Sequence, residues 1–438
     1  MLDIIASSLL GLLLEIFRDP AKKPEALELI SWHDAAIFEL PESESGSMVQ
    51  QIVDEYLDSL SQQGMNKNSQ GVWLQSDWFE LGEHQSNIPL PAASLTKIAT
   101  TLAVVGKLGI EHRFVTGIYH TGSIREGILE GDLIIEGNGD PFFVWEEAIA
   151  LSNALNQLGI REIEGNLLVN EQFYMNYKSD SFASGKLLKQ GLNSSLWSAE
   201  VKQQFQTLPL TTPRPQLAIK GEVKVIKNIP PNAQLLLLHQ SLPLADILRQ
   251  MNIYSNNKMA QMLADTVGGA SAVASYGIET TGVSTSEIQL INGSGLGEEN
   301  RISPRAATKM LIAIDRLLQP NNLDVMDIFP VAGRDRLGTI EGRQLPQGVA
   351  IKTGTLNQVS ALAGLIAIDD KRRVWFTVVN NGWQIEKFRQ QQDELLQKLA
   401  RHWQLASNLE GQSFPTTQVY LGDPKRNQIH QTGMRDEG

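Results

Sequence analysis

The last third of the chain carries the pattern that most constrains its fold. Two apolar runs, residues 360–368 and 374–379, flank a polar Asp369-Asp-Lys-Arg-Arg373 segment, and such a pair is typical of an antiparallel hairpin. The following residues, 385–403, have an amphipathic helical period, and its apolar members are Phe388, Leu395, Leu396, Leu399 and Trp403. A hairpin followed by such a helix predicts an antiparallel sheet covered by that helix.

A second helix is predicted directly after Ser94. Residues 71–79 are typical of a strand, and a polar run leads from there through two prolines to Ser94. From this serine onward, Leu95, Ile98, Ala99 and Leu102 recur at helical spacing, and Gly109 is the expected end. Ser94 therefore opens a buried helix.

The middle of the chain is predicted to contain shorter elements. Short strands broken by glycine are expected at residues 117–120, 127–129, 132–136 and 164–169, with a helix near 144–158, whereas residues 178–195 show little periodicity. We predict a main domain formed by residues 1–110 and 240–408, an inserted β-rich domain at 111–239, and an extended or disordered tail at 409–438.

Composition excludes several kinds of function. The chain has 438 residues, 42% of them hydrophobic, so it can bury a large core. Its net charge of -12, without a basic stripe interleaved with aromatics, argues against nucleic acid as a partner. The absence of cysteine excludes disulfides and a thiol nucleophile, and the seven histidines show no metal-ligand spacing. We therefore expect no metal and no cofactor.

The N-terminal residues 4–14 leave the route of export open. They are apolar enough for a signal peptide, but Asp3 stands where basic residues are expected and no clear cleavage site follows. The stretch is too short to span a membrane. A helix that packs on the domain or lies at a membrane interface is the alternative, which would give peripheral membrane association.

Three short motifs follow one another along the chain: Ser94-Leu-Thr-Lys97, Ser255-Asn-Asn257 and Lys352-Thr-Gly354. A Ser followed three residues later by Lys arises about once or twice by chance in such a chain, and it recurs here at Ser255-Asn-Asn-Lys258. The ordered trio is much rarer, and it is the signature of serine acyl transfer in penicillin-interacting enzymes. The motifs together predict one acyl-transfer site.

Ser94 and Lys97 supply the nucleophile and its base. Three residues apart on a helix, they lie on one face within reach of a hydrogen bond. Lysine accepts a proton only when neutral, which requires burial and a neighbouring positive charge such as Lys352. The N–H of Ser94 is a candidate oxyanion donor. Taken alone, the pair would more simply be a serine near a helix start with an exposed lysine.

Ser255 and Asn257 lie where a loop enters a helix. From there Ser255 can relay a proton to the leaving amine, and the Asn257 amide can hold Lys97 and a substrate carbonyl. A cluster that only caps the helix is the simpler reading of these residue types.

Lys352 ends a strand, followed by Thr353, Gly354 and Thr355. The predicted roles are a cation, a hydroxyl for a substrate carboxylate, close approach of substrate backbone at the glycine, and a second oxyanion donor at the Thr355 N–H. Strand alternation points Thr353 away from Lys352 and Gly354, so it does not bring all these side chains together. An exposed strand end is the plain alternative.

These motifs and several others resemble one family, the D-alanyl-D-alanine carboxypeptidase/endopeptidase family, or class C low-molecular-mass penicillin-binding proteins. The resemblance spans roughly residues 88–382. The matching segments are Pro91-Ala-Ala-Ser94, Gly131-Asp-Leu133, Gly139-Asp-Pro141, Ile163-Glu-Gly-Asn166, His239-Gln-Ser-Leu-Pro243, Pro330-Val-Ala-Gly333, Gly338-Thr339 and Lys352-Thr-Gly-Thr-Leu356.

The resemblance implies an α+β fold, a penicillin-binding/β-lactamase-like transpeptidase domain with an inserted β-rich domain. It implies that Ser94 is the acylated nucleophile, Lys97 its base, Ser255 and Asn257 the second element, and Lys352-Thr353-Gly354 the strand that recognises a carboxylate. The implied substrates are peptidoglycan stem peptides ending in D-Ala-D-Ala, the implied inhibitors are β-lactams, and the implied location is periplasmic or otherwise extracytoplasmic.

The chain also departs from the family pattern. Asn292 stands where the family has Asp before Gly-Ser-Gly-Leu, and Gln261 stands where it has Glu. Ser94 and Ser255 are 161 residues apart, which is shorter than usual and predicts one insert where the family has two. No Trp-rich, Asp-containing segment follows Phe173, so selectivity for the stem-peptide side chain is not predicted.

Two alternatives remain at this point. One is a non-catalytic cell-wall-binding protein on the same fold, and the other is a β-lactamase or esterase. Oligomeric state is not predicted.

Overall fold

The computed structural model describes residues 44–77, 79–369, 372–405 and 420–430. The chain divides into two compact units, Met1–Ser45 and Gly46–Gly438, and the elements below belong to the second, except that the first helix begins at Glu44. The apolar residues 4–14 lie outside the described residues, as do positions 406–419 and 431–438.

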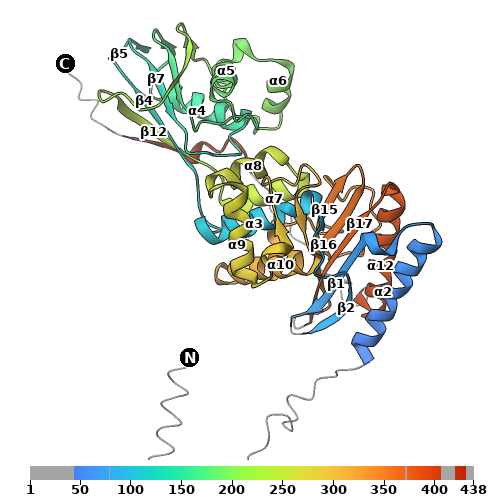
Figure 1. The fold of residues 1–438 in the computed structure, drawn as a ribbon. Coiled ribbons are helices and arrows are strands. Elements are labelled where there is room, and N and C mark those ends of the chain that lie inside the picture. Colours follow the sequence, from blue (N-terminus) through green and yellow to red (C-terminus); the bar gives the residue numbers. More distant parts are fainter. Residues whose placement is uncertain (1–43, 78, 370–371, 406–419, 431–438) are drawn as a thin grey trace, which may run out of the picture. The chain divides into compact units, whose positions relative to one another are not determined.

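Five antiparallel strands form the sheet that the hairpin predicts (Figure 1). Their order is β15-β16-β17-β1-β2. The bounds are β1 (Gln70–Ser76), β2 (Glu80–His84), β15 (Ala350–Leu356), β16 (Val359–Ala367) and β17 (Arg373–Asn381). The predicted hairpin is confirmed, because β16 pairs with β17 from Val359 opposite Asn381 to Ala367 opposite Arg373. β15 is the edge strand of this sheet.

Helices α2 (Glu44–Gln62) and α12 (Ile385–His402) cover one face of the sheet (Figure 1). Four of the predicted apolar positions of α12 are buried: Phe388, Leu395, Leu396 and Leu399. Trp403 packs, partly buried, against the same core. The predicted sheet-covering helix is confirmed, because its apolar stripe meets apolar side chains of α2 and of the sheet.

A group of helices packs on the other face around a second apolar core. These helices are α3 (Thr96–Leu108), α7 (Leu244–Tyr254), α8 (Asn257–Thr266), α9 (Gly269–Thr281), α10 (Pro304–Leu318) and α11 (Val325–Ile328). Helix α3 is buried from Thr96 to Val105 and ends at Gly109, whose φ is 83°. The predicted buried helix is confirmed, although it begins two residues after Ser94.

A small three-stranded sheet leads the chain to Ser94. It consists of β3 (Leu90–Pro91), β14 (Arg301–Ile302) and β13 (Ile288–Gln289). β14 lies between the other two strands, so it ties the segment before Ser94 to the segment after α9.

The middle of the chain folds around a third apolar core of its own. Two sheets carry it, one in the order β11-β9-β7-β4-β12-β18, in which β18 is Asn427–Ile429, and one in the order β10-β8-β6-β5. The strands are β4 (Val115–His120), β5 (Ile124–Arg125), β6 (Ile128–Leu129), β7 (Leu133–Glu136), β8 (Glu162–Ile163), β9 (Leu167–Asn170), β10 (Ala218–Ile219), β11 (Val223–Ile226) and β12 (Gln234–Gln240). The helices are α4 (Trp145–Gln157), α5 (Ser181–Gly191) and α6 (Ala199–Phe205). The four strands and the helix expected here are all present, with shifted ends.

Helix α5 lies within residues 178–195, where the sequence shows little periodicity. Asp180 caps it by accepting a hydrogen bond from the N–H of Ala183, 2.7 Å away. Its buried face consists largely of small residues, Ser181, Ser184 and Gly185, with Leu188. Because Leu188 is the only large apolar residue among them, a hydrophobicity pattern does not reveal the helical period.

Residues 420–430 add an ordered segment that the sequence pattern did not predict. β18 (Asn427–Ile429) pairs antiparallel with β12. Arg426 forms an ion pair with Glu147 of α4, and both side chains are nearly buried. Asn427 Oδ1 lies 2.9 Å from His239 Nδ1. This part of the predicted tail is therefore held by buried polar contacts.

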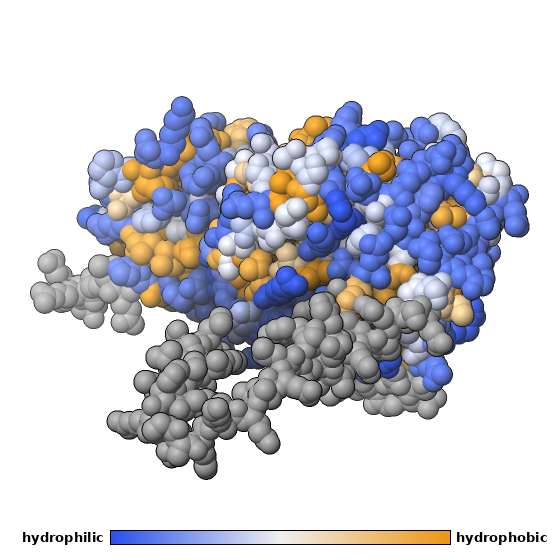
Figure 2. Space-filling view, turned by 60° about the horizontal axis from the view of Figure 1, so that its bottom comes forward, coloured by the Kyte–Doolittle hydropathy of each residue, from blue (hydrophilic) through white to orange (hydrophobic). Residues whose placement is uncertain are grey.

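Apolar side chains are dispersed over the visible surface. Figure 2 shows a mostly hydrophilic face on which hydrophobic residues form small, separate groups, as is usual for a protein surface. In the part of the chain that the structure describes, no helix combines the length and apolar character needed to cross a bilayer.

Replacing Arg426 by alanine should destabilise this protein by about 3 kcal/mol, because it leaves the Glu147 carboxylate buried and unpaired. Lys425→Ala is the matched control, since Lys425 is exposed and such surface changes stay within about 0.5 kcal/mol. Urea denaturation followed by tryptophan fluorescence measures both. Equal midpoints for the two variants would show that the Arg426 contact contributes nothing to stability.

Candidate active site

Ser94 lies in a tight turn between β3 and α3. The 3-10 turn Ala93–Leu95 carries it, and Ala92 anchors the turn by donating to the Asn300 carbonyl over 2.8 Å. Ala93 has a φ of 47°, a left-handed conformation that is uncommon for a residue with a side chain. Ser94 itself is half-buried whereas its neighbours on both sides are buried. The turn thus presents one hydroxyl to solvent at the start of a buried helix.

The Lys97 amine lies at the centre of the site. Its Nζ is 2.8 Å from Ser94 Oγ, 2.7 Å from Asn257 Oδ1 and 2.7 Å from the Ser294 carbonyl. Asn257 Oδ1 and the carbonyl can only accept hydrogen bonds. A neutral amine has two N–H groups for these acceptors, which leaves its lone pair for the Ser94 hydroxyl proton. The charged amine can donate to all three oxygens, and the neutral amine keeps its two obligate acceptors while its lone pair faces Ser94 Oγ.

Burial favours the neutral form of Lys97. Lys97 is 0% exposed, and desolvation lowers its pKa from 10.5 to about 7. Desolvation is the main cause of the lowered pKa of Lys97. The expected repulsion between the two lysines is also present: the pKa of Lys352 is lowered well below 10.5 by burial and by Lys97.

Ser255 and Asn257 take different positions at the junction of two helices. Ser255 ends α7 in the left-handed conformation, with φ 51° and ψ 42°. Asn256 caps α8 by accepting from the N–H groups of Lys258 and Met259. The capping role that residues of this type often have therefore falls to Asn256, and the Asn257 side chain is left to contact Lys97.

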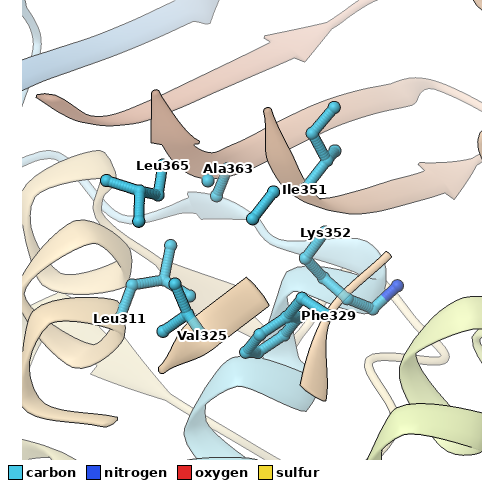
Figure 3. Close-up of a pocket in the computed structure, with 9 residues that line it drawn as sticks. Leu311, Val325, Phe329, Ile351, Lys352, Ala363 and Leu365 are labelled. Carbon is cyan, nitrogen blue, oxygen red and sulfur yellow. The ribbon is translucent and has the colours of Figure 1, made fainter. Parts of the chain in front are cut away.

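Lys352 extends from β15 through an apolar pocket. Figure 3 shows its side chain passing Phe329, with the nitrogen pointing away from Leu311, Val325 and Leu365. The Nζ reaches Ser255 Oγ and the Thr353 carbonyl, each 3.0 Å away. The site thus contains two serine–lysine pairs, Ser94 with Lys97 and Ser255 with Lys352.

Gly354 brings the edge strand against the turn that carries Ser94. A Cβ on Gly354 would lie 3.0 Å from the Ala92 carbonyl oxygen and 3.2 Å from the Ser94 nitrogen. The glycine therefore permits β15 to approach the turn that carries Ser94. This role is additional to the close approach of substrate backbone that we predicted for Gly354.

The open edge of β15 resolves the problem of strand alternation. The Ile351 N–H donates away from the sheet to the Pro330 carbonyl over 2.8 Å. Since backbone groups alternate along a strand, the N–H groups of Thr353 and Thr355 point to the same open edge. The Thr355 N–H therefore comes beside the Ser94 turn through the backbone, which suits the predicted pair of oxyanion donors.

The side chains of Thr353 and Thr355 do not point to the open edge of β15 as their N–H groups do. Thr353 is 6% exposed, and Thr355 Oγ1 accepts a hydrogen bond from Arg389 of α12 over 3.0 Å. The Thr355 side chain thus points toward α12.

The Ser294 carbonyl is a contributor to the site that sequence reasoning missed. Asn292 Oδ1 shapes its turn by accepting from the N–H groups of Ser294 and Gly295 and from the Ser294 hydroxyl. Gln261 Oε1 accepts from the Gly293 N–H over 3.0 Å. The two departures from the family pattern, Asn292 and Gln261, therefore support one turn. The Asn-Gly-Ser-Gly sequence signals a turn, but its contact with Lys97 is not encoded locally.

No group of three or more His, Cys, Asp or Glu side chains is arranged to hold a metal within the described ranges.

Comparisons with known proteins agree on one family. Residues 53–185 and 214–402 match the model of the D-Ala-D-Ala carboxypeptidase 3 (S13) family. The D-alanyl-D-alanine carboxypeptidase DacB of Haemophilus influenzae is 25% identical, over 69% of this chain and 83% of its own length. Carboxypeptidase DacB of Mycolicibacterium smegmatis is 30% identical, but the match spans only 32% of this chain and 34% of that relative.

Solved structures confirm the predicted fold class. A predatory endopeptidase of Bdellovibrio bacteriovorus has a TM-score of 0.67 and 22% identity, covering 82% of this chain and 99% of its own. Penicillin-binding protein 4 of Haemophilus influenzae has a TM-score of 0.60 and 20% identity, covering 79% and 99%. Since the family model matches well over half of its length, this chain belongs to the D-Ala-D-Ala carboxypeptidase 3 (S13) family and is a serine hydrolase.

Proposed function

We propose that this protein is a penicillin-sensitive serine D-Ala-D-Ala carboxypeptidase/endopeptidase that acts on peptidoglycan stem peptides through an acyl-enzyme at Ser94. The observation that carries this proposal is the buried Lys97 amine, 2.8 Å from Ser94 Oγ and held by Asn257 and Ser294. A serine hydroxyl becomes a nucleophile only beside such a base.

Acylation follows from this arrangement. Neutral Lys97 accepts the Ser94 proton while Ser94 Oγ bonds to the carbonyl carbon of the D-Ala-D-Ala peptide bond. The negative charge that develops on the carbonyl oxygen is stabilised by the N–H groups of Ser94 and Thr355. These donors belong to the backbone, so they need no reorganisation during the reaction.

The C–N bond of the peptide then breaks, its electron pair goes to the nitrogen, and the leaving amine takes a proton for which we assign the Ser255 hydroxyl as donor. This hydroxyl lies 3.0 Å from Lys352 Nζ, which orients the hydroxyl toward the site. Transfer of the proton from Lys97 to Ser255 restores both residues. Lys97 then takes a proton from water as the water oxygen bonds to the acyl carbon, the bond between that carbon and Ser94 Oγ breaks, and Lys97 returns the proton to Ser94 Oγ.

The activities for which related proteins are named support this function. Several relatives are carboxypeptidases by name. The Haemophilus penicillin-binding protein 4 has been solved with a β-lactam, and the Bdellovibrio endopeptidase has been solved acylated by penicillin G. β-Lactams as inhibitors of this chain are part of the proposal.

Location and domain organisation complete the proposal. Peptidoglycan lies outside the cytoplasm, so we place the protein in the periplasm or another extracytoplasmic space. We retain the main domain of residues 1–110 and 240–408, in which the site lies, and the insert at 111–239, which the separate apolar core supports.

Mass spectrometry after penicillin treatment tests the nucleophile. The wild-type protein should gain the mass of one penicillin on the peptide that contains Ser94, and Ser94→Ala should gain none. Ser255→Ala is the control: it should still be labelled at Ser94, but more slowly, because it lacks the proton relay.

Other outcomes would contradict the proposal. Labelling of Ser94→Ala would exclude Ser94 as the nucleophile. A wild-type protein that never forms the adduct would indicate the non-catalytic cell-wall-binding alternative. Rapid loss of the adduct, without release of D-Ala from a pentapeptide, would indicate a β-lactamase or esterase.

The rate of acylation should depend on pH through Lys97. Burial lowers the pKa of Lys97 to about 7, and only the neutral amine accepts the Ser94 proton. The second-order rate constant should therefore level off above about pH 7 and fall about tenfold per pH unit below it. Lys97→Arg should be at least 100-fold slower throughout, roughly as expected for loss of a general base. A wild-type profile without an inflection near neutrality would contradict this role of Lys97.

A further inference from the structure

Arg389 of α12 lies beside the open edge of β15 without a role in the chemistry described so far. Its Nη2 donates to Thr355 Oγ1 over 3.0 Å, and its Nη1 donates to Glu386 Oε1 over 2.8 Å. The arginine side chain is 34% exposed. The solvent-accessible guanidinium of Arg389 therefore contacts β15, the strand along which the peptide binds, through the Thr355 hydroxyl.

This position matches the place of the substrate's terminal carboxylate. In the proposed reaction the scissile carbonyl lies between the N–H groups of Ser94 and Thr355. Only one Cα separates the leaving nitrogen from the carboxylate of the terminal D-Ala, so the anion lies within about one residue length, ~3.8 Å, of the scissile bond. The Thr355 hydroxyl belongs to the residue that carries the oxyanion N–H, so it lies within the same range.

Arg389 also differs from the two lysines of the site in burial and in the shape of its head group. Lys97 and Lys352 are buried, whereas the partly exposed guanidinium of Arg389 presents paired N–H groups to a carboxylate. Glu386, the present ion-pair partner, is 82% exposed. Such a surface pair is weak, so a substrate carboxylate can replace it.

We propose that Arg389, together with the Thr355 hydroxyl, binds the free terminal carboxylate of the substrate and makes this end group a selectivity requirement. The inference rests on the proposed function. A substrate whose terminal carboxylate is masked cannot form the ion pair with Arg389. An enzyme without Arg389 therefore distinguishes less well between a substrate with a free carboxylate and one with a masked carboxylate.

Two matched pairs of compounds test this role. The first pair is an acylated D-Ala-D-Ala peptide and its C-terminal amide, compared by kcat/KM. The second pair is penicillin G and its methyl ester, compared by the rate constant of acylation. The proteins are the wild type, Arg389→Ala, Arg389→Lys and the control Lys387→Ala, which removes an exposed positive charge from the same helix.

In each pair the preference of the wild type for the free carboxylate should fall roughly tenfold in Arg389→Ala, as expected for a partly exposed charge-assisted hydrogen bond. Arg389→Lys should restore part of the preference, and Lys387→Ala should keep all of it. The inference would be overturned if Arg389→Ala left the ratio of rate constants between the free and the masked compound unchanged. An equal decrease of the rate constants for both compounds would be such a result.

The penicillin pair keeps this test separate from the proposed function. If the wild type forms the penicillin adduct but cleaves neither peptide, the peptidase function fails, and the ratio between penicillin and its ester still decides the role of Arg389.

Discussion

Three hydrogen bonds to one nitrogen, the Lys97 Nζ, hold the active site together. They come from the turn that carries Ser94, from the start of α8 and from the turn at Ser294. Two of these partners lie 160 and 197 residues away along the chain. A buried amine without its partners would cost about 1–3 kcal/mol for each lost bond. The same burial makes Lys97 a base, so stability and reactivity depend on one arrangement.

Strained backbone accompanies this arrangement on both sides. Ala93 and Ser255 have left-handed φ angles of 47° and 51°, each of which costs of the order of 1–3 kcal/mol. Two glycines allow the neighbouring segments to close in: a Cβ on Gly295 would lie 1.7 Å from the Ala93 carbonyl oxygen, and one on Gly354 would lie 3.2 Å from the Ser94 nitrogen. The packing that holds the strain in place also brings Ser94 beside the edge strand.

The spacing of apolar residues in the sequence predicted those helices and strands in which that spacing is regular. The hairpin β16–β17, the covering helix α12 and the buried helix α3 were all expected, because each has an apolar face that must be buried. Helix α5 was missed because its buried face is made largely of small polar residues and glycine. The strand β18 was missed because the contacts of Arg426 and Asn427 that accompany it reach distant residues, Glu147 and His239.

Residue types and short-range geometry were enough to predict the candidate residues of the site, the order of the three motifs and the helix that places Lys97 one turn from Ser94. Packing between distant segments creates the burial that lowers the pKa of Lys97, brings the Ser294 carbonyl to it as a third partner, and turns the Thr355 N–H to the open edge and its hydroxyl to Arg389. Burial and contact between distant segments arise from packing, and no local pattern specifies them.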